Sequence, residues 1–194
     1  MSKAASAERQ QQRTLNKFGR LLLSVHDFQQ ALSAAVFLLE EAEEKGRYPL
    51  STLRRFRCFE TALVVAYARP FSQTKGEIGR LEWKDLGFKL EGAELQLHKR
   101  LIESRNRLHA HTDADMVTMG IYEYDGKITV HFDEQLRFTE AEVLQIKALC
   151  EILIQTSAAR YRALGKQLNF ADVDTSIIDA GHMDGDGGTW LPAR

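Results

Sequence analysis

The sequence contains little cysteine, the residue that forms disulfides and many metal sites, and little proline. Among its 194 residues are only two cysteines and three prolines. The cysteines, Cys58 and Cys150, are too far apart in the chain to suggest a zinc-ligand spacing, and two of them make no disulfide framework. Each lies in an apolar, helix-like stretch, so we expect buried thiols in a reducing compartment.

Long hydrophobic runs are also lacking. The longest, ALVVAYA, is far shorter than the roughly 20 residues that cross a bilayer. The N-terminal stretch MSKAASAERQQQR has no apolar segment of the kind that marks a secretory signal. We therefore expect a cytoplasmic protein with no membrane partner.

No excess of either charge is present. The formal net charge is -1 and the pI is about 6.6, so any nucleic-acid site must be a local patch or be assembled between subunits. The chain has no Gly-rich phosphate loop, no serine nucleophile elbow and no CxxC pair. Its DGDGG stretch lacks the ligand spacing of a calcium loop. We expect no cofactor and no metal site.

What the sequence does contain is helical periodicity. Hydrophobic residues make up 44%, enough for one domain with a full core. A first helix is predicted from Leu15 to the acidic segment EEAEEKG, where Gly46 and Pro49 stop it. Residues 1–13 form a polar extension that frays or lengthens this helix. The residues expected on its apolar face are Leu15, Phe18, Leu22, Val25, Phe28, Leu32, Val36 and Leu39.

Two further helices are predicted in the middle of the chain. Ser51 is a plausible N-cap for the second, which Pro70 ends. A glycine-containing connection then follows, irregular apart from one helical turn. The third helix is predicted over residues 93–110.

The remainder changes character twice. Val, Ile, Thr and Tyr alternate around Asp125 and Gly126, which predicts a β-hairpin at about residues 116–133. Thr139 and Glu142 have the spacing of a capping box, so the fourth helix is predicted from there to about residue 168. The Gly- and Asp-rich residues 169–194 are expected to be a mobile tail. The predicted fold class is all-α: a four-helix up-down bundle over residues 14–168, with a small hairpin inserted between helices three and four.

The end of the third helix is the candidate site, because RNRLHAHTD (residues 105–113) concentrates polar side chains there. On a helical wheel, Leu97, Leu101 and Leu108 form one apolar stripe, and Leu95 and Ile102 form another. Arg105 and His109 fall between the two stripes. A guanidinium is costly to desolvate without a partner, and arginine commonly recognises phosphate or carboxylate groups.

These residue types suit metal-free RNA cleavage. His111, near or just beyond the last turn, could swing back towards Arg105 and transfer a proton at neutral pH. Arg105 could hold a phosphate and stabilise the added charge of its transition state. Asn106 could orient the histidine or the sugar. The 2'-hydroxyl would be the nucleophile, and a symmetric dimer would supply a second copy of these groups.

The motif RNRLHAH also resembles the signature of the HEPN superfamily, in which an arginine and a polar residue precede a histidine by a short spacing. Arg105, Asn106 and His111 match it, and RNRLHAHTD is similar to the RN-basic-x-x-AH-x-D form of small bacterial HEPN proteins. FETALVVAYARPFSQTKG resembles the second-helix region of HEPN-like families. The resemblance covers roughly residues 15–168. The predicted hairpin is an insertion relative to the minimal fold.

What the resemblance implies is a helical homodimer with the motif at its interface. Active members are metal-independent endoribonucleases of toxin–antitoxin, abortive-infection and phage-defence systems, and others lack nuclease activity. On that mapping Arg105 and His111 are catalytic and Asn106 supports them. His109, which the family pattern does not require, is a further candidate for support from the residues alone, as are Arg107 and Arg69. RNA and a cognate antitoxin are the implied partners. The alternative is a non-catalytic module for dimerisation or for binding a nucleotide or protein.

Simpler interpretations exist for each of these residues. Basic side chains in a last turn complement the helix dipole, and this applies both to the motif and to Arg69. Arg54, Arg55 and Arg57 form either a solvated face or a weak RNA-binding surface. His98 shares the Arg105 face two turns earlier, where a core or interface role is the more common one.

Overall fold

A computed structural model describes residues 3–43, 46–73, 76, 78–109, 119–124, 126–132 and 138–170. The described chain is mostly helical, which confirms the all-α character that the periodicity predicts. In chain order its elements are α1 (Lys3–Glu41), α2 (Leu50–Ala68), the 3-10 turn η1 (Arg69–Phe71), α3 (Trp83–Leu86), α4 (Gly92–Ser104), the π-helical η2 (Arg105–His109), β1 (Met119–Tyr124), β2 (Lys127–Phe132) and α5 (Glu140–Gln167).

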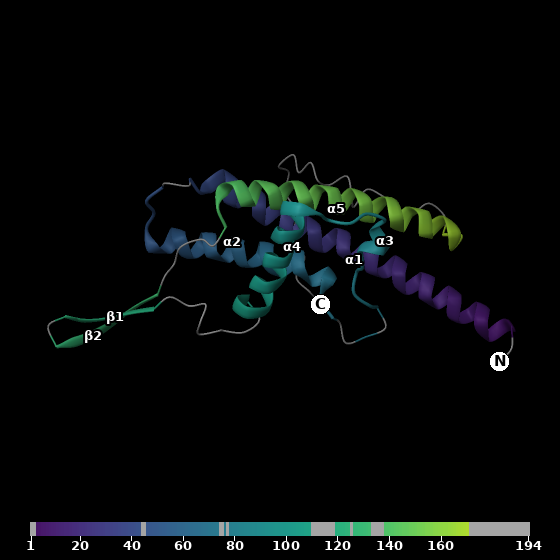
Figure 1. Cartoon of the computed structure of the whole chain (residues 1–194), viewed down its shortest axis with the longest axis horizontal. Coiled ribbons are helices and arrows are strands. Elements are labelled where there is room, and N and C mark those ends of the chain that lie inside the picture. Colours follow the sequence, from purple (N-terminus) through teal and green to yellow (C-terminus); the bar gives the residue numbers. More distant parts are fainter. Residues whose placement is uncertain are drawn as a thin grey trace, which may run out of the picture.

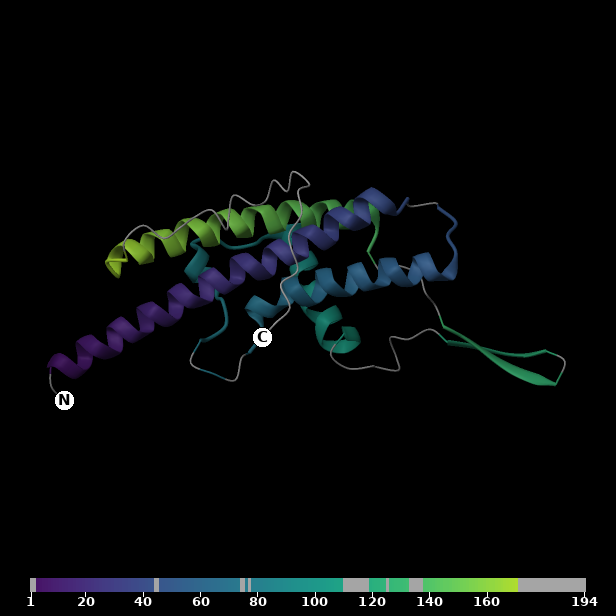
Figure 2. The same cartoon turned by 180° about the vertical axis from the view of Figure 1, so that it is seen from behind.

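Three long helices form the body of the molecule. Helix α1 packs along both α2 and α5 and runs opposite to them in direction (Figure 1). Its first turns extend beyond the other helices, as Figure 2 shows from behind. The polar residues expected as a separate N-terminal extension are therefore mostly part of α1, which begins at Lys3.

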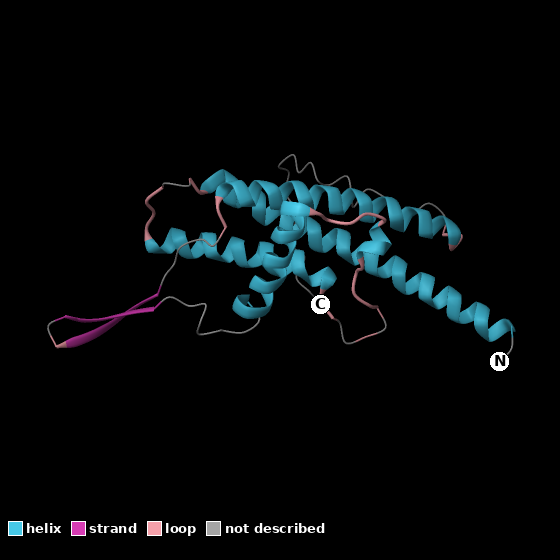
Figure 3. Ribbon diagram, viewed as in Figure 1, coloured by secondary structure: helices cyan, strands magenta, loops and turns pink. Residues whose placement is uncertain are grey.

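Helix α4 lies across these three helices instead of along them (Figure 3). It is only 13 residues long and contacts α2 and α5. Between α2 and α4 the chain forms η1 and the single turn of α3, in agreement with an irregular connection containing one helical turn. Both α4 and η2 contact α2.

The core lies where α1 meets α2 and α5. The core residues of α1 include Leu21, Val25 and Phe28, all at most 2% exposed. Leu22, which the periodicity placed on the apolar face, is 38% exposed, so the face is wrong by one residue at this point. The buried face of α1 contacts both α2 and α5. It also includes small residues, such as Ala31 and Ala35, which the pattern of large apolar residues does not count, and Leu21 takes the place expected for Leu22.

The helix ends follow local sequence in most cases. The predicted capping box of α5 is confirmed: the Thr139 hydroxyl accepts from the Glu142 N–H, and the Glu142 carboxylate accepts from the Thr139 N–H. The Ser51 cap is wrong, because Pro49 occupies the N-cap and α2 already begins at Leu50. Proline suits this place, since the first N–H groups of a helix have no intrahelical partner.

Strands β1 and β2 pair antiparallel, with Met119 opposite Phe132 and Tyr124 opposite Lys127. Gly126 adopts a positive φ of 69°, a conformation that favours glycine. In both side views the two strands point away from the helices (Figures 1 and 2). Asp125 and residues 171–194 of the expected tail lie outside the described residues.

The two cysteines differ in their environments. Cys150 is buried on α5, and burial raises the pKa of its thiol to about 12. Cys58 is exposed on α2, so the expectation of two buried thiols is wrong for this residue. The reason is the phase of α2: its neighbours Phe56 and Glu60 point inward and take the buried face.

Helix α1 is long and apolar enough over Ala7–Glu41 to meet the length and composition of a membrane-spanning helix. Half of that apolar window is buried inside the protein, where it packs against α2 and α5. Core helices meet the same criterion, so this is weak support for a membrane role.

Candidate functional site

The RNRLHAHTD motif begins where α4 ends. Arg105 is the C-cap of α4 and the first residue of η2. Its side chain is partly buried, and its Nη1 donates a hydrogen bond of 3.0 Å to the Oδ1 of Asn106. Asn106 itself is exposed. The first two residues of the motif therefore form one unit, in which an amide oxygen from the next residue orients a guanidinium.

A π-helical turn carries the first five residues of the motif, Arg105–His109, whereas the sequence predicts an α-helix to about residue 110. Hydrogen bonds from residue i to i+5 widen this turn, and such turns are rare and frequent at functional sites. The position of His109 on an α-helical wheel therefore no longer applies. Arg107, partly buried, donates to the Glu103 carboxylate one turn earlier at 3.3 Å.

His111 lies outside the described residues, as does the rest of the motif from Ala110 to Asp113. The pairing of Arg105 with His111 therefore stays a prediction from the sequence. What the described residues establish is the Arg105–Asn106 contact and its position at the end of α4.

His98, two turns before Arg105 on α4, is built into the aromatic packing of the protein. Its Nδ1 lies 3.0 Å from the hydroxyl of the fully buried Tyr67 on α2. Burial lowers the pKa of His98 to about 4, so the ring is neutral at physiological pH. Burial also raises the pKa of Tyr67 well above its usual value, which keeps the phenol protonated.

An open groove of about 440 Å³ lies beside this histidine, and we call it the aromatic groove. The rings of Phe71 and Trp83 are stacked, with centroids 5.0 Å apart and planes inclined by 28°. The His98 ring meets each of them edge-on, at 4.8 Å and 5.0 Å. Leu81 is buried in the lining, which also contains Glu82 and the exposed side chains of Arg80 and Lys84.

A second polar cluster lies on α1, and we call it the buried charge cluster. Asp27, 4% exposed, accepts from Arg20 at 3.4 Å and from Arg69 at 2.6 Å. The Nε of Arg20 also donates to Ser24, and Arg69 reaches Gln30 at 3.3 Å. Burial lowers the pKa of Arg20, while Asp27 opposes that shift. Arg69, expected near the motif, is thus an ion-pair partner of α1.

Two of the three basic residues near the start of α2 form ion pairs. Arg55 pairs with Glu41 at the end of α1, and the Nε of Arg57 lies 3.9 Å from the Glu60 carboxylate. Arg54 is exposed and also takes part in an interaction. Pairing with acidic groups reduces the positive field that an RNA surface would need, which favours the solvated-face interpretation.

On α1, sequence reasoning missed three buried polar residues, Arg20, Ser24 and Asp27. Their spacing of four and three residues follows the helical period within the apolar face of α1. A charged residue at such a position must have a partner when it is buried, and this signal could have identified the cluster. The aromatic groove was also missed, because its rings come from the irregular connection after α2.

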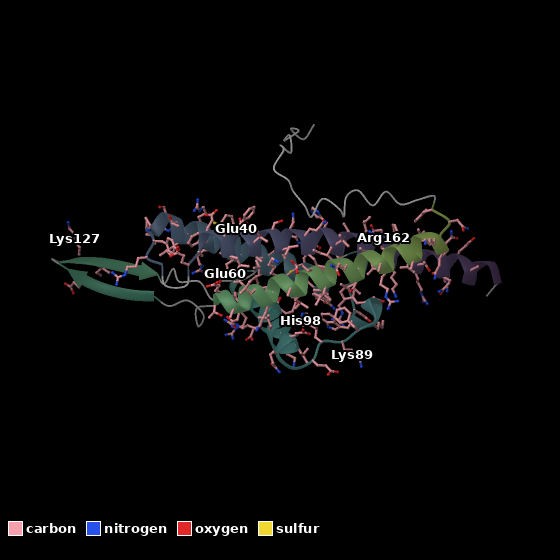
Figure 4. All side chains as sticks on the ribbon, turned by 90° about the horizontal axis from the view of Figure 1, so that it is seen from above. Glu40, Glu60, Lys89, His98, Lys127 and Arg162 are labelled. Atoms are coloured by element: carbon pink, nitrogen blue, oxygen red, sulfur yellow. The ribbon has the colours of Figure 1, made fainter. Side chains whose placement is uncertain are left out.

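The buried carboxylate of Glu60 has a structural role at the start of α5. Its Oε1 accepts a hydrogen bond of 3.1 Å from the backbone N–H of Phe138. Figure 4 shows Glu60 near the end of α5 that follows the strands, and His98 farther along the bundle. Glu60 therefore fixes the point at which the chain returns to the helices.

Within the residues that the structure describes, no group of three His, Cys, Asp or Glu side chains could hold a metal ion. No family model, no curated protein and no solved structure matches this chain.

Proposed function

We propose that the protein is a HEPN-like, metal-independent endoribonuclease of a toxin–antitoxin or phage-defence system. Arg105 binds the scissile phosphate and stabilises its transition state, Asn106 orients Arg105, and His111 transfers the proton. The 2'-hydroxyl of the RNA gives its proton to one His111 and attacks the adjacent phosphorus, the bond to the 5'-oxygen of the next nucleotide breaks, and that oxygen takes a proton from the His111 of the second subunit. The products are a 2',3'-cyclic phosphate and a 5'-hydroxyl.

The contact between Arg105 and Asn106 carries this proposal. A partly buried guanidinium held by the adjacent amide is pre-oriented, so less freedom is lost when it binds a phosphate. Asn106 is exposed, and the described strands point away from the helices (Figures 1 and 2). Both observations favour a motif that a ligand can reach.

The site is proposed to be shared across a homodimer. One chain supplies one Arg105 and one His111, whereas a two-fold axis beside the motif would supply two of each, enough for an acid, a base and two cations. β1 and β2 are proposed to pack on the second subunit, because a two-stranded hairpin is marginally stable alone. A cognate antitoxin would cover the motif.

The test is cleavage of a structured RNA in EDTA by the wild type and by His111→Ala and Arg105→Ala variants. Each substitution is expected to lower the rate by about 100-fold or more. Two matched controls are available. His26→Ala removes an exposed histidine of α1, and Arg162→Ala removes an exposed arginine of α5. Equal rates for the wild type and the His111→Ala variant would contradict the proposal.

A non-catalytic module for dimerisation or for binding a nucleotide or protein is the second candidate. The observation in its favour is that Arg105 is already satisfied in part by Asn106, as a structural arginine would be. On this alternative Arg105→Ala lowers the dimer association constant, measured by analytical ultracentrifugation, while no RNA is cleaved at any protein concentration.

A further inference from the structure

The aromatic groove has the composition of a nucleobase site. Base recognition outside a duplex relies on stacking against aromatic side chains, on hydrogen bonds to base edges, and on cations that hold the backbone. Phe71 and Trp83 supply partly exposed rings, stacked on each other at 5.0 Å. Arg80 and Lys84 supply cations at the rim.

The groove is held in shape by the rest of the fold. His98 meets both rings edge-on and is itself held by the hydroxyl of Tyr67, which is fully buried. Trp83 also packs edge-on against Phe88, at 5.6 Å. A preformed groove loses little side-chain entropy on binding a flat ring.

The charges at the rim favour a polyanion. Three charged side chains line the groove: Arg80, Lys84 and Glu82. Lys84 pairs with Glu82, and Arg80 is exposed, so the net charge of the three is +1. A mainly apolar peptide would make no use of this rim, whereas a nucleotide places its base on the rings and its phosphate at the cations.

The groove and the proposed cleavage motif lie on nearly the same face of α4. His98 and Arg105 are seven residues apart on one helix, which is two turns and about 10 Å along the axis of α4. Seven residues bring two side chains back to nearly the same face. A strand of RNA that placed a phosphate at Arg105 would therefore pass the groove with a neighbouring nucleotide.

We propose that the aromatic groove binds one unpaired base of a single-stranded RNA, as a subsite beside the Arg105 motif. The base stacks on the exposed face of the Phe71–Trp83 pair, and Arg80 contacts the phosphate that follows it. As a subsite for cleavage the inference rests on the proposed function, but binding itself is measured without any cleavage.

The experiment uses the fluorescence of Trp83 in the intact groove. The other tryptophan of the chain is replaced (Trp190→Phe), and His111→Ala is added to prevent cleavage. The probe is a 2'-O-methyl RNA hexamer, which has no attacking hydroxyl, and the reference is the same backbone without bases. We expect the hexamer to quench Trp83 and the abasic chain to bind about 10-fold more weakly without quenching.

Substitutions then assign the contacts, with affinity measured by fluorescence anisotropy of a labelled hexamer. Trp83→Leu is expected to weaken binding about 10-fold, and Arg80→Gln about 3-fold with a smaller salt dependence. The matched control is Arg162→Gln, which removes an exposed arginine of α5 that lies apart from His98 in Figure 4, and it should leave affinity unchanged. If the Trp83→Leu variant does not fold, the quenching of Trp83 in the protein with an intact groove still tests whether a base binds there.

Four outcomes overturn the inference: no binding of the hexamer, equal binding of the abasic chain, binding without quenching of Trp83, or quenching only by an added protein or peptide. Quenching by uridine monophosphate but not by ribose 5-phosphate would support a base site.

The inference and the proposed function can fail separately. Cleavage that Trp83→Leu leaves unchanged would remove the subsite alone, and quenching without cleavage by wild type would remove the nuclease alone.

Discussion

Two arginine clusters in this protein show opposite ways of placing a cation in a helical fold. In the buried charge cluster, the carboxylate of Asp27 is shared by Arg20, two turns away on the same helix α1, and by Arg69, which comes from the distant segment η1. At the end of α4, the described hydrogen bonds of Arg105 and Arg107 go to Asn106 and Glu103, residues of the same helical segment.

The difference indicates what each cluster is for. A buried charge that is shared between distant segments holds those segments together, because removing one partner leaves the other desolvated. A cation that donates to an exposed neighbour, as Arg105 does to Asn106, is expected to contribute less to tertiary structure and to be usable for a ligand at little cost in stability. The comparison therefore predicts large stability effects in the first cluster and small ones in the second.

The largest effect is expected for Asp27→Ala. This change leaves Arg20, 6% exposed, without its carboxylate, and we expect a loss of about 3 to 5 kcal/mol in the free energy of unfolding. Urea denaturation followed by circular dichroism measures it. The double variant Asp27→Ala/Arg20→Met should recover part of the loss, since it removes the orphaned charge. A loss below 1 kcal/mol would mean that the cluster is not structural.

The second-largest effect is expected for His98. It tests whether the part of α4 before Arg105 contributes to the stability of the fold. In the unfolded chain a histidine titrates near 6.5, whereas the pKa of His98 in the fold is about 4. Between these values the unfolded state binds more protons, so the stability present above pH 6.5 is lost as the pH falls towards 4.

A pKa difference of about 2.5 units corresponds to about 3.4 kcal/mol at most. Because the ring keeps some contact with water, we expect the free energy of unfolding to fall by about 2 kcal/mol between pH 7 and pH 4. Its neighbours Tyr67, Phe71 and Trp83 carry no charge in this range. His98→Gln should remove this part of the acid sensitivity, measured as the difference from wild type in urea midpoints across the pH series. Parallel pH curves for the two proteins would contradict it.

Local signals in the sequence predict the parts of this fold that local physics decides. The Thr139–Glu142 box begins α5 as expected. The Pro70 signal is only roughly right: α2 ends at Ala68, and Arg69, just before the proline, keeps α-helical dihedral angles as the chain continues into η1. Spacing alone could not predict the crossing of α4, which depends on packing between helices. The α-helical period also could not predict the π-turn at Arg105, because a change of hydrogen-bond pattern leaves no periodic signature.

The candidate site was predictable to a different extent. Arg105 and Asn106 were identified from the motif, and their contact is a local one between adjacent residues. The partnership of Arg69 with Asp27 joins residues 42 positions apart, so no pattern in one sequence indicates it. The aromatic groove likewise combines Phe71 and Trp83 with His98 on a later helix.

Arg69→Ala should have an intermediate effect. The Arg69 side chain is 51% exposed, so it gains less from its pair than Arg20 does, and Asp27 would keep Arg20 as a partner. We expect a loss of about 1 kcal/mol in the free energy of unfolding. The control is Lys17→Ala, which removes a cation of similar exposure that pairs with Asp85. A loss above 3 kcal/mol would place Arg69, and not Arg20, at the centre of the buried charge cluster.

The smallest effects on stability are expected at the end of α4. Arg107→Ala removes a surface pair between residues i and i+4, a change of about 0.3 to 0.5 kcal/mol. Arg105→Ala should cost about 1 kcal/mol or less, since the hydrogen bond it loses goes to the exposed Asn106. Both are measured by urea denaturation at low and at high salt. If Arg105→Ala were as costly as Asp27→Ala, Arg105 would be a structural arginine and the contrast between the two clusters would disappear. If it is as mild as Arg107→Ala, any loss of RNA cleavage in that variant reflects the chemistry of the site and not the fold.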